Sequence, residues 1–333
     1  MLGRFVRGLV ALGAGALAFG AGQAYALDHV TFGTDWKAEA EHGGYYQAIA
    51  TGIYRKHGIE VELRQGGPQV NQSQLLAAGR LDFDIASNSF IPLNFVKQSI
   101  PMVAVAAMFQ KDPAVLIAHR GVGNDSLADL KGKPIMVGGD TRVGWWLFLK
   151  AKFGYTDDQI RTYTFNIVPF LANKNAVQQG YLTSEPYLIE KAGVTPNVFL
   201  IADAGYASYA SIIETSDKLV REKPDLVRRF VDASIEGWAS YLRDPTPGNA
   251  LIKKDNPEES DAILAYAVAK MKQYGIVDSG DAKTLGVGAM TDARWAEFFK
   301  VMSGEGLYPK DMNYRNAYTL RFVNHRVGME HEK

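Results

Sequence analysis

From residue 28 onward the chain alternates short β-rich runs with helical patterns, and this alternation limits the possible folds more than any other feature. Alternating apolar side chains at Ile59, Val61 and Leu63 predict a strand. Residues 44–57 before them predict a helix, which ends at Gly58. Repeated units of this kind are typical of open α/β layers. We therefore expect an α/β fold.

The length of the chain and two apolar segments predict two lobes. A chain of 333 residues, 47% of them hydrophobic, is long enough to build more than one core. The run 103–118, broken at residues 111–113, predicts a first crossing between lobes, and 209–215 predicts the return. We assign residues 27–118 and 211–333 to a discontinuous first lobe and residues 119–210 to a second lobe.

The C-terminal third of the chain is mostly helical in pattern. After Pro224, apolar side chains such as Phe230, Ile235 and Trp238 recur at three- and four-residue spacing. This stripe predicts core packing. Further helices at 262–274 and 293–301 are expected to pack back on the first lobe.

The N-terminus has the pattern of a secretory signal peptide. Arg4 and Arg7 precede an apolar stretch at 8–20, and the small-x-small sequence at 24–26 is typical of a cleavage site. The apolar stretch is shorter than the roughly 20 residues that a membrane helix needs. We expect residues 1–26 to be removed, leaving a soluble periplasmic chain that begins near Leu27. No cysteine is present to accept a lipid.

Composition argues against several functional classes. Lys plus Arg and Asp plus Glu both number 36, so the formal charge is zero and nucleic-acid binding has little electrostatic support. Without cysteine the chain cannot form disulfides, thiolate metal sites or a cysteine nucleophile. Its six histidines are scattered without ligand spacing, and no nucleotide-binding or hydrolase motif occurs. We expect a monomer that needs no metal or cofactor.

Candidate binding residues lie in loops that follow predicted strands, because open α/β sheets bind ligands at the carboxyl ends of their strands. Several have a structural alternative: His42, Ser89 and Thr141 can be helix caps, and only one of the neighbours Trp145 and Trp146 can face a cleft. The candidate ligand-binding residues are Asp35, Trp36, Glu39, His42, Tyr45, Gly67, Gln69, Asn88, Ser89, Thr141, Arg142, Trp145, Asn166, Glu185 and Tyr187.

Two kinds of ligand are compatible with these residues. Aromatic side chains such as Trp36 can stack on a flat heterocycle, while Asp35 or Glu185 accepts hydrogen bonds from its amino groups. An aminopyrimidine has this character. Arg142 favours the alternative of an anionic solute such as a sulfonate or nitrate, since a guanidinium at a helix start binds anionic groups well.

Several motifs resemble one known family in order and spacing. They are Asp35-Trp36, Glu39, His42 to Ala48, Gly52-Ile53-Tyr54, Gly58 to Val61, Leu75 to Phe83, Leu127 to Gly132 and Ser184 to Tyr187. The whole chain after residue 26 resembles the periplasmic binding proteins related to thiamine-pyrimidine synthases, a family with relatives for riboflavin, sulfonates and nitrate. The resemblance implies the type II periplasmic-binding fold, with two α/β lobes joined by two crossing segments.

The resemblance also implies partners and a function. It implies the solute-binding component of an ABC importer, working with a permease and an ATPase, and it places Glu185 and Pro186 beside the cleft. The expected ligand is a thiamine-precursor-like pyrimidine, with an anion or riboflavin as alternatives. A synthase-like enzyme is a further alternative, but the family's synthases carry a cysteine-rich motif that this chain lacks, so we expect no enzyme activity. A sensory role with the same fold remains open.

Overall fold

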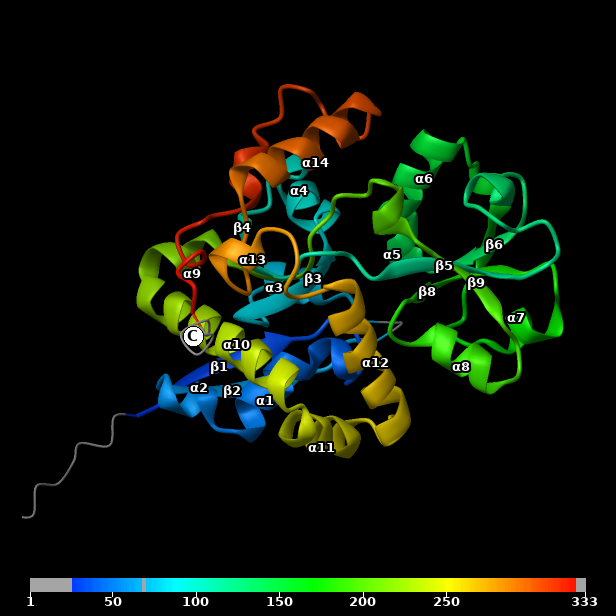
Figure 1. Cartoon of the computed structure of the whole chain (residues 1–333). Helices are drawn as coiled ribbons and strands as arrows, with labels where there is room; N and C mark the ends of the chain where they lie inside the picture. Colours follow the sequence, from blue (N-terminus) through cyan, green and yellow to red (C-terminus); the bar gives the residue numbers. More distant parts are fainter. Residues whose placement is uncertain (1–25, 68–69, 328–333) are drawn as a thin grey trace, which may run out of the picture.

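The computed structural model describes residues 26–67 and 70–327 (Figure 1). The predicted signal peptide therefore lies outside the described residues, except for Ala26, and so does Gln69. No helix in the described ranges combines the length and apolar character that crossing a bilayer requires.

Two five-stranded sheets form the two halves of the molecule (Figure 1). The first has the order β2-β1-β3-β10-β4 and the second the order β7-β6-β8-β5-β9. The strands of the first sheet are β1 Asp28–Gly33, β2 Ile59–Arg64, β3 Phe83–Asn88, β4 Met102–Phe109 and β10 Ala210–Ser216. Those of the second are β5 Ala114–His119, β6 Ile135–Val137, β7 Ile160–Thr162, β8 Val177–Tyr181 and β9 Pro196–Leu200. This mixed α/β architecture confirms the predicted fold class.

The chain crosses between the sheets twice. Residues 110–113 join β4 to β5, and residues 201–209 join β9 to β10. Each crossing delivers a strand that lies antiparallel to both of its neighbours: β5 between β8 and β9, and β10 between β3 and β4. The predicted boundary between the lobes after residue 118 places β5 in the first lobe, but this strand pairs with β8 and β9 in the second sheet. The return segment predicted at 209–215 is largely β10 itself.

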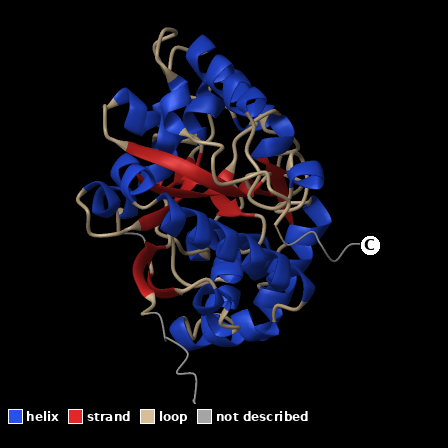
Figure 2. Cartoon of the chain, turned by 90° about the vertical axis from the view of Figure 1, so that its left-hand side faces the viewer, coloured by secondary structure: helices blue, strands red, loops and turns tan. Residues whose placement is uncertain are grey.

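Helices cover the sheets on both sides (Figure 2). In the half with the first sheet they are α1 Gly43–Ala50, α2 Ile53–Lys56, α3 Gln72–Ala77, α4 Phe90–Lys97, α9 Asp217–Glu222, α10 Pro224–Arg243, α11 Thr246–Asp255, α12 Asp261–Tyr274, α13 Ala282–Leu285 and α14 Asp292–Gly304. In the half with the second sheet they are α5 Gly139–Arg142, α6 Trp145–Phe153, α7 Val168–Ala172 and α8 Glu185–Lys191.

One helix predicted as continuous is broken at a glycine. Gly52 has a left-handed backbone (φ 73°), so the predicted helix 44–57 divides into α1 and α2. Gly144 (φ −116°, ψ −127°) lies between α5 and α6, and residues 139–142, which were predicted to lie in a loop, form α5.

The core of the first half is built on aromatic packing between β-strands and α10. The Phe230 ring stacks on Phe83 with centroids 4.0 Å apart, and Tyr54 stacks on the same ring at 5.4 Å. The α10 residues of the predicted stripe are buried, including Ile235 and Trp238. The prediction that this stripe is core packing is confirmed.

Candidate functional site

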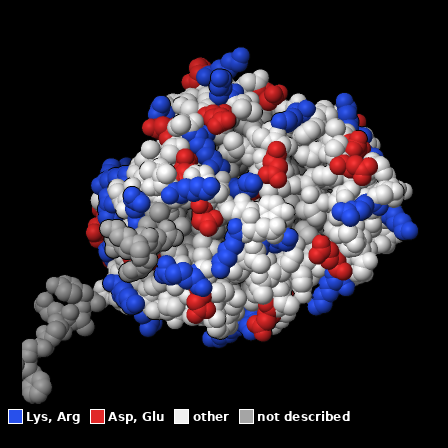
Figure 3. All heavy atoms as spheres, viewed as in Figure 1, with Lys and Arg blue, Asp and Glu red and all other residues white. Residues whose placement is uncertain are grey.

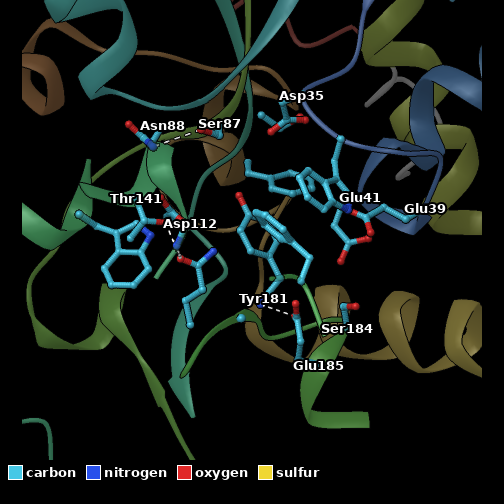
Figure 4. Close-up of a pocket in the computed structure, with 18 of the residues that line it drawn as sticks. Asp35, Glu39, Glu41, Ser87, Asn88, Asp112, Thr141, Tyr181, Ser184 and Glu185 are labelled. Atoms are coloured by element: carbon cyan, nitrogen blue, oxygen red, sulfur yellow. Dashed lines mark hydrogen bonds between the residues drawn. The ribbon is translucent and has the colours of Figure 1, made fainter. Parts of the chain in front are cut away.

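A cavity of about 180 Å³ lies between the two sheets (Figure 4). The part of its wall that belongs to the first sheet's half consists of Asp35, Trp36, Glu39, Glu41, His42, Ser87, Asn88, Phe109 and Ser211. The second half supplies Gly138, Thr141, Trp145, Tyr163, Phe165, Gln179, Gly180, Tyr181, Ser184 and Glu185, and the first crossing supplies Asp112. Most of these residues end or follow strands, as the rule for open α/β sheets predicts.

The structure brings together eight of the predicted binding residues. Those that line the cavity are Asp35, Trp36, Glu39, His42, Asn88, Thr141, Trp145 and Glu185. Trp145 faces the cavity, whereas the neighbouring Trp146 is buried and donates from Nε1 to Asp157. Whether the eight contact a solute stays a prediction.

Four other residues predicted to bind a ligand do not line the cavity. Tyr45 lies one layer behind the cavity wall, and its hydroxyl is 3.2 Å from the Ser211 Oγ. The Ser89 Oγ accepts the Tyr209 N–H at 3.0 Å and so holds the second crossing against β3. Asn166 is exposed and accepts the Val168 N–H at the start of α7. Gly67 (φ 153°) does not line the cavity either.

Arg142 and Tyr187 also point away from the cavity. Arg142 lies on a separate depression with Lys150 and Asp157. The preceding residue Thr141 faces inward and donates to Gln179, and successive side chains on a helix diverge by about 100°. The position of Arg142 therefore gives no support to the alternative in which this side chain binds an anionic solute in the cleft. Tyr187 packs on Tyr266, with ring centroids 5.2 Å apart.

The cavity is strongly acidic. Five carboxylates line it, from Asp35, Glu39, Glu41, Asp112 and Glu185, and no Lys or Arg of the described chain does. On the face of the molecule shown in Figure 3, side chains of both charges are intermixed.

Burial raises the pKa of most of these carboxyls. It raises the pKa of Asp112 to about 7, and burial together with nearby carboxylates holds the pKa of Glu39 well above its usual range. Burial also raises the pKa of Glu41 and of Glu185, although hydrogen bonds partly oppose this effect. Several of these groups therefore hold protons at a pH where exposed carboxyls are ionised.

Two carboxylates are held by their neighbours. The Asp35 Oδ1 is 2.9 Å from Nε2 of His42, a side chain only 2% exposed. The two oxygens of Glu185 accept from the Tyr163 hydroxyl at 2.9 Å and from the Tyr181 N–H at 2.8 Å. These contacts fix both carboxyl groups at the cavity wall.

Aromatic side chains form the other part of the wall. The rings of Trp36 and Phe165 have centroids 4.5 Å apart, and Tyr163 lies 4.9 Å from Phe165. Phe165 has a left-handed backbone (φ 56°), a conformation costly for a large side chain. Ser211 on the opposite wall is also left-handed (φ 46°). Such strain concentrates at functional sites.

Three contacts join the two halves across the cavity. Trp36 packs on Phe165, the Thr183 hydroxyl donates to the Glu41 carboxylate, and Tyr187 of α8 packs on Tyr266 of α12. The helices α8 and α12 face each other in Figure 1. The structure is thus a closed arrangement in which both halves touch.

The sequence predictions missed part of the wall. The lining residues that no prediction included are Glu41, Phe109, Asp112, Gly138, Tyr163, Gln179, Gly180, Tyr181, Ser184 and Ser211. Many end or follow strands, so the strand-end rule could have identified them. Asp112 gave no such signal, because an aspartate directly before Pro113 is typical of a turn.

Comparison with known proteins agrees with this architecture. The sequence profile described as NMT1/THI5 like matches residues 39–247. The chain is 25% identical over 305 residues to the riboflavin-binding protein RibY of Chloroflexus aurantiacus, covering 89% of this chain and 86% of that protein. It is 22% identical over 232 residues to a 4-amino-5-hydroxymethyl-2-methylpyrimidine phosphate synthase of Schizosaccharomyces pombe, covering 65% and 66% respectively.

Among solved structures, the chain resembles the periplasmic aliphatic sulphonate binding protein SsuA of Escherichia coli. The TM-score is 0.65 at 13% identity, and the match covers 87% of this chain and 91% of that protein. At this identity the likeness concerns the fold. The two-lobed architecture is therefore the periplasmic binding protein fold.

Proposed function

This chain belongs to the NMT1/THI5-like family, and from that premise we propose that it is the periplasmic solute-binding component of an ABC importer. It holds a small heterocycle, of the aminopyrimidine type, between two lobes that close on it. The observation that carries the proposal is the cavity itself, where carboxylates and aromatic rings from both halves of the fold face a common space.

The chemistry of the wall favours a solute that donates hydrogen bonds. Trp36 and Phe165 offer ring faces, and Asp35 and Glu185 offer acceptors to amino groups. Each hydrogen bond to a charged group contributes roughly 1.5–3 kcal/mol. An anionic solute would instead meet five carboxylates with no Lys or Arg of the described chain beside it. A sulfonate or nitrate is therefore disfavoured, although a sulphonate-binding protein shares the fold.

The size of the cavity favours a compact solute. Its 180 Å³ is close to the roughly 150 Å³ of a cavity known to accept benzene. A single ring with small substituents therefore suits the closed form. The second candidate is riboflavin, which is favoured by the 25% identity to a riboflavin-binding protein. A three-ring solute would require the halves to stand further apart.

Delivery to a membrane permease follows from lobe closure. A solute that contacts both halves binds the closed form better than the open form, and so shifts the population towards closure. A permease and an ATPase at the inner membrane are the proposed partners, and residues 1–26 the proposed export signal. We propose binding without chemical conversion. The chain has no cysteine nucleophile, and a riboflavin-binding protein is among its relatives, although a synthase is as well.

The test is a thermal-shift screen of the chain from Leu27 against aminopyrimidines, riboflavin, alkanesulfonates and nitrate. We expect stabilisation by an aminopyrimidine that mass spectrometry then recovers unchanged. Stabilisation by an anion alone, or release of a new product, would overturn the proposal.

A further inference from the structure

We propose that the solute is an organic cation and that its positive group is bound beside Glu39. This inference rests on the proposed function and deepens it, since a neutral heterocycle and a cationic one are different classes of solute. It is carried by the arrangement of carboxylates and rings around one part of the cavity wall.

Glu39 stands in a group of carboxylates that faces it from several elements. Glu41 is on the same loop, Asp35 follows β1, Glu185 begins α8 of the other half, and Glu259 lies between α11 and α12. All four act on Glu39 as like charges. Figure 4 shows Glu39 and Glu41 on one side of the cavity, with Asp35 and Glu185 at its opposite ends. The only basic side chain of the described wall is His42, which pairs with Asp35.

These acids keep acceptors free for a ligand. Within the described residues, no side-chain or backbone donor is found at the Glu39 carboxyl. Asp112 is only 2% exposed, and one of its oxygens accepts the Ala114 N–H at 2.9 Å. No described group donates to its other oxygen, although the side chain lines the cavity. A buried acid with an unused acceptor in a cavity wall points to a ligand donor.

Aromatic rings complete a cage suited to a cation. Trp36 and Phe165 lie in contact on the wall, and Tyr181 lines it nearby. A cation near a ring face is attracted by the ring's negative electrostatic face, most strongly when it is desolvated. Carboxylates combined with ring faces thus recognise an ammonium or amidinium group attached to a ring.

A cationic solute would also offset the like charges around Glu39. Without a cation, like charges and burial raise the pKa of Glu39, and the carboxyls retain protons. A bound cation favours the ionised carboxylates and releases those protons. A neutral solute would leave the protons in place, so proton release distinguishes the two classes.

The test compares two probes that differ only in charge. An aminopyrimidine with an aminomethyl group is compared with the same ring carrying a hydroxymethyl group, and benzylammonium is compared with benzyl alcohol. We expect calorimetry at about pH 7 to give about tenfold or greater preference for each ammonium compound, with proton release to the buffer. Equal or weaker binding of the ammonium compounds would overturn the inference while leaving a heterocycle-binding function intact.

A charge-removing variant locates the positive group. We expect Glu39→Gln to reduce the ratio of ammonium-probe affinity to hydroxymethyl-probe affinity to less than about threefold. The matched control is Glu258→Gln, an exposed glutamate paired with Lys37, which should keep the full preference. An unchanged ratio of the two affinities in Glu39→Gln would refute the placement of the positive group beside Glu39. The ratio can be measured even if the variant is less stable. Stabilisation by zinc, magnesium or calcium alone would also refute it.

Discussion

Asp112→Asn should make the protein more stable at neutral pH while weakening its binding of solute. Asp112 lies on the first crossing, 2% exposed, and burial raises its pKa from 3.8 to about 7. The difference corresponds to about 4 kcal/mol at about 1.4 kcal/mol per pH unit. Asparagine keeps an oxygen that can accept the Ala114 N–H, and it removes the ionisable group.

The sign of the pH dependence follows from linkage. Below its ordinary pKa, Asp112 is protonated in both the folded and the unfolded chain, and it costs nothing. Between about pH 4 and about pH 7 the unfolded chain loses this proton while the folded chain keeps it, so stability falls as the pH rises. Asparagine has no ionisable side chain, so the variant does not lose this stability as the pH rises. The variant should therefore match the natural protein near about pH 4 and exceed it by up to about 4 kcal/mol near about pH 8.

The assay is urea unfolding of both proteins, starting from Leu27, across this pH range. Effects of all other titrating groups largely cancel in the difference between the two free energies of unfolding. A difference that stays constant with pH would refute the reasoning about Asp112. The same variant should bind an ammonium probe about tenfold more weakly, because it loses a charge-assisted hydrogen bond.

Three further variants test the cavity wall. Trp36→Ala should weaken solute binding about tenfold, since it removes one ring face of the cavity, and unchanged affinity by calorimetry would place the solute elsewhere. Thr183→Val removes the hydrogen bond to Glu41 across the cavity, so it should weaken binding severalfold and leave a larger open population in small-angle scattering. Arg142→Ala should change solute affinity by less than about twofold, because Arg142 lies on a separate depression, and a large loss would mean that it reaches the cleft.

Local patterns predicted the layers of the fold well. The alternation at Ile59 to Leu63 became β2, and the apolar stripe around Phe230 became the buried face of α10. These patterns report which face of an element is buried, which is a local property of the sequence. Loops after strands likewise predicted Asp35, Trp36 and Glu185 at one cavity, because parallel strands bring their carboxyl ends to the same edge.

The direction in which a side chain points, and contacts between residues far apart in the sequence, could not be predicted in the same way. Arg142 lies on a separate depression because residues 139–142 form the short helix α5, where a loop had been predicted, and successive helical side chains diverge by about 100°. Glu41 is buried by its contact with Thr183 of the other half, 142 positions further along the chain. Asp112 resembled a turn residue in the sequence, and only the crossing of the chain between sheets buries it at the cavity.

The most direct test of the central claim is small-angle X-ray scattering of the chain from Leu27, with and without a saturating solute found by the thermal-shift screen. The contacts of Trp36 with Phe165 and of Glu41 with Thr183 exist only when the halves meet. The account predicts that the radius of gyration falls when the solute binds. An unchanged scattering profile at saturation would contradict closure of two lobes around a solute.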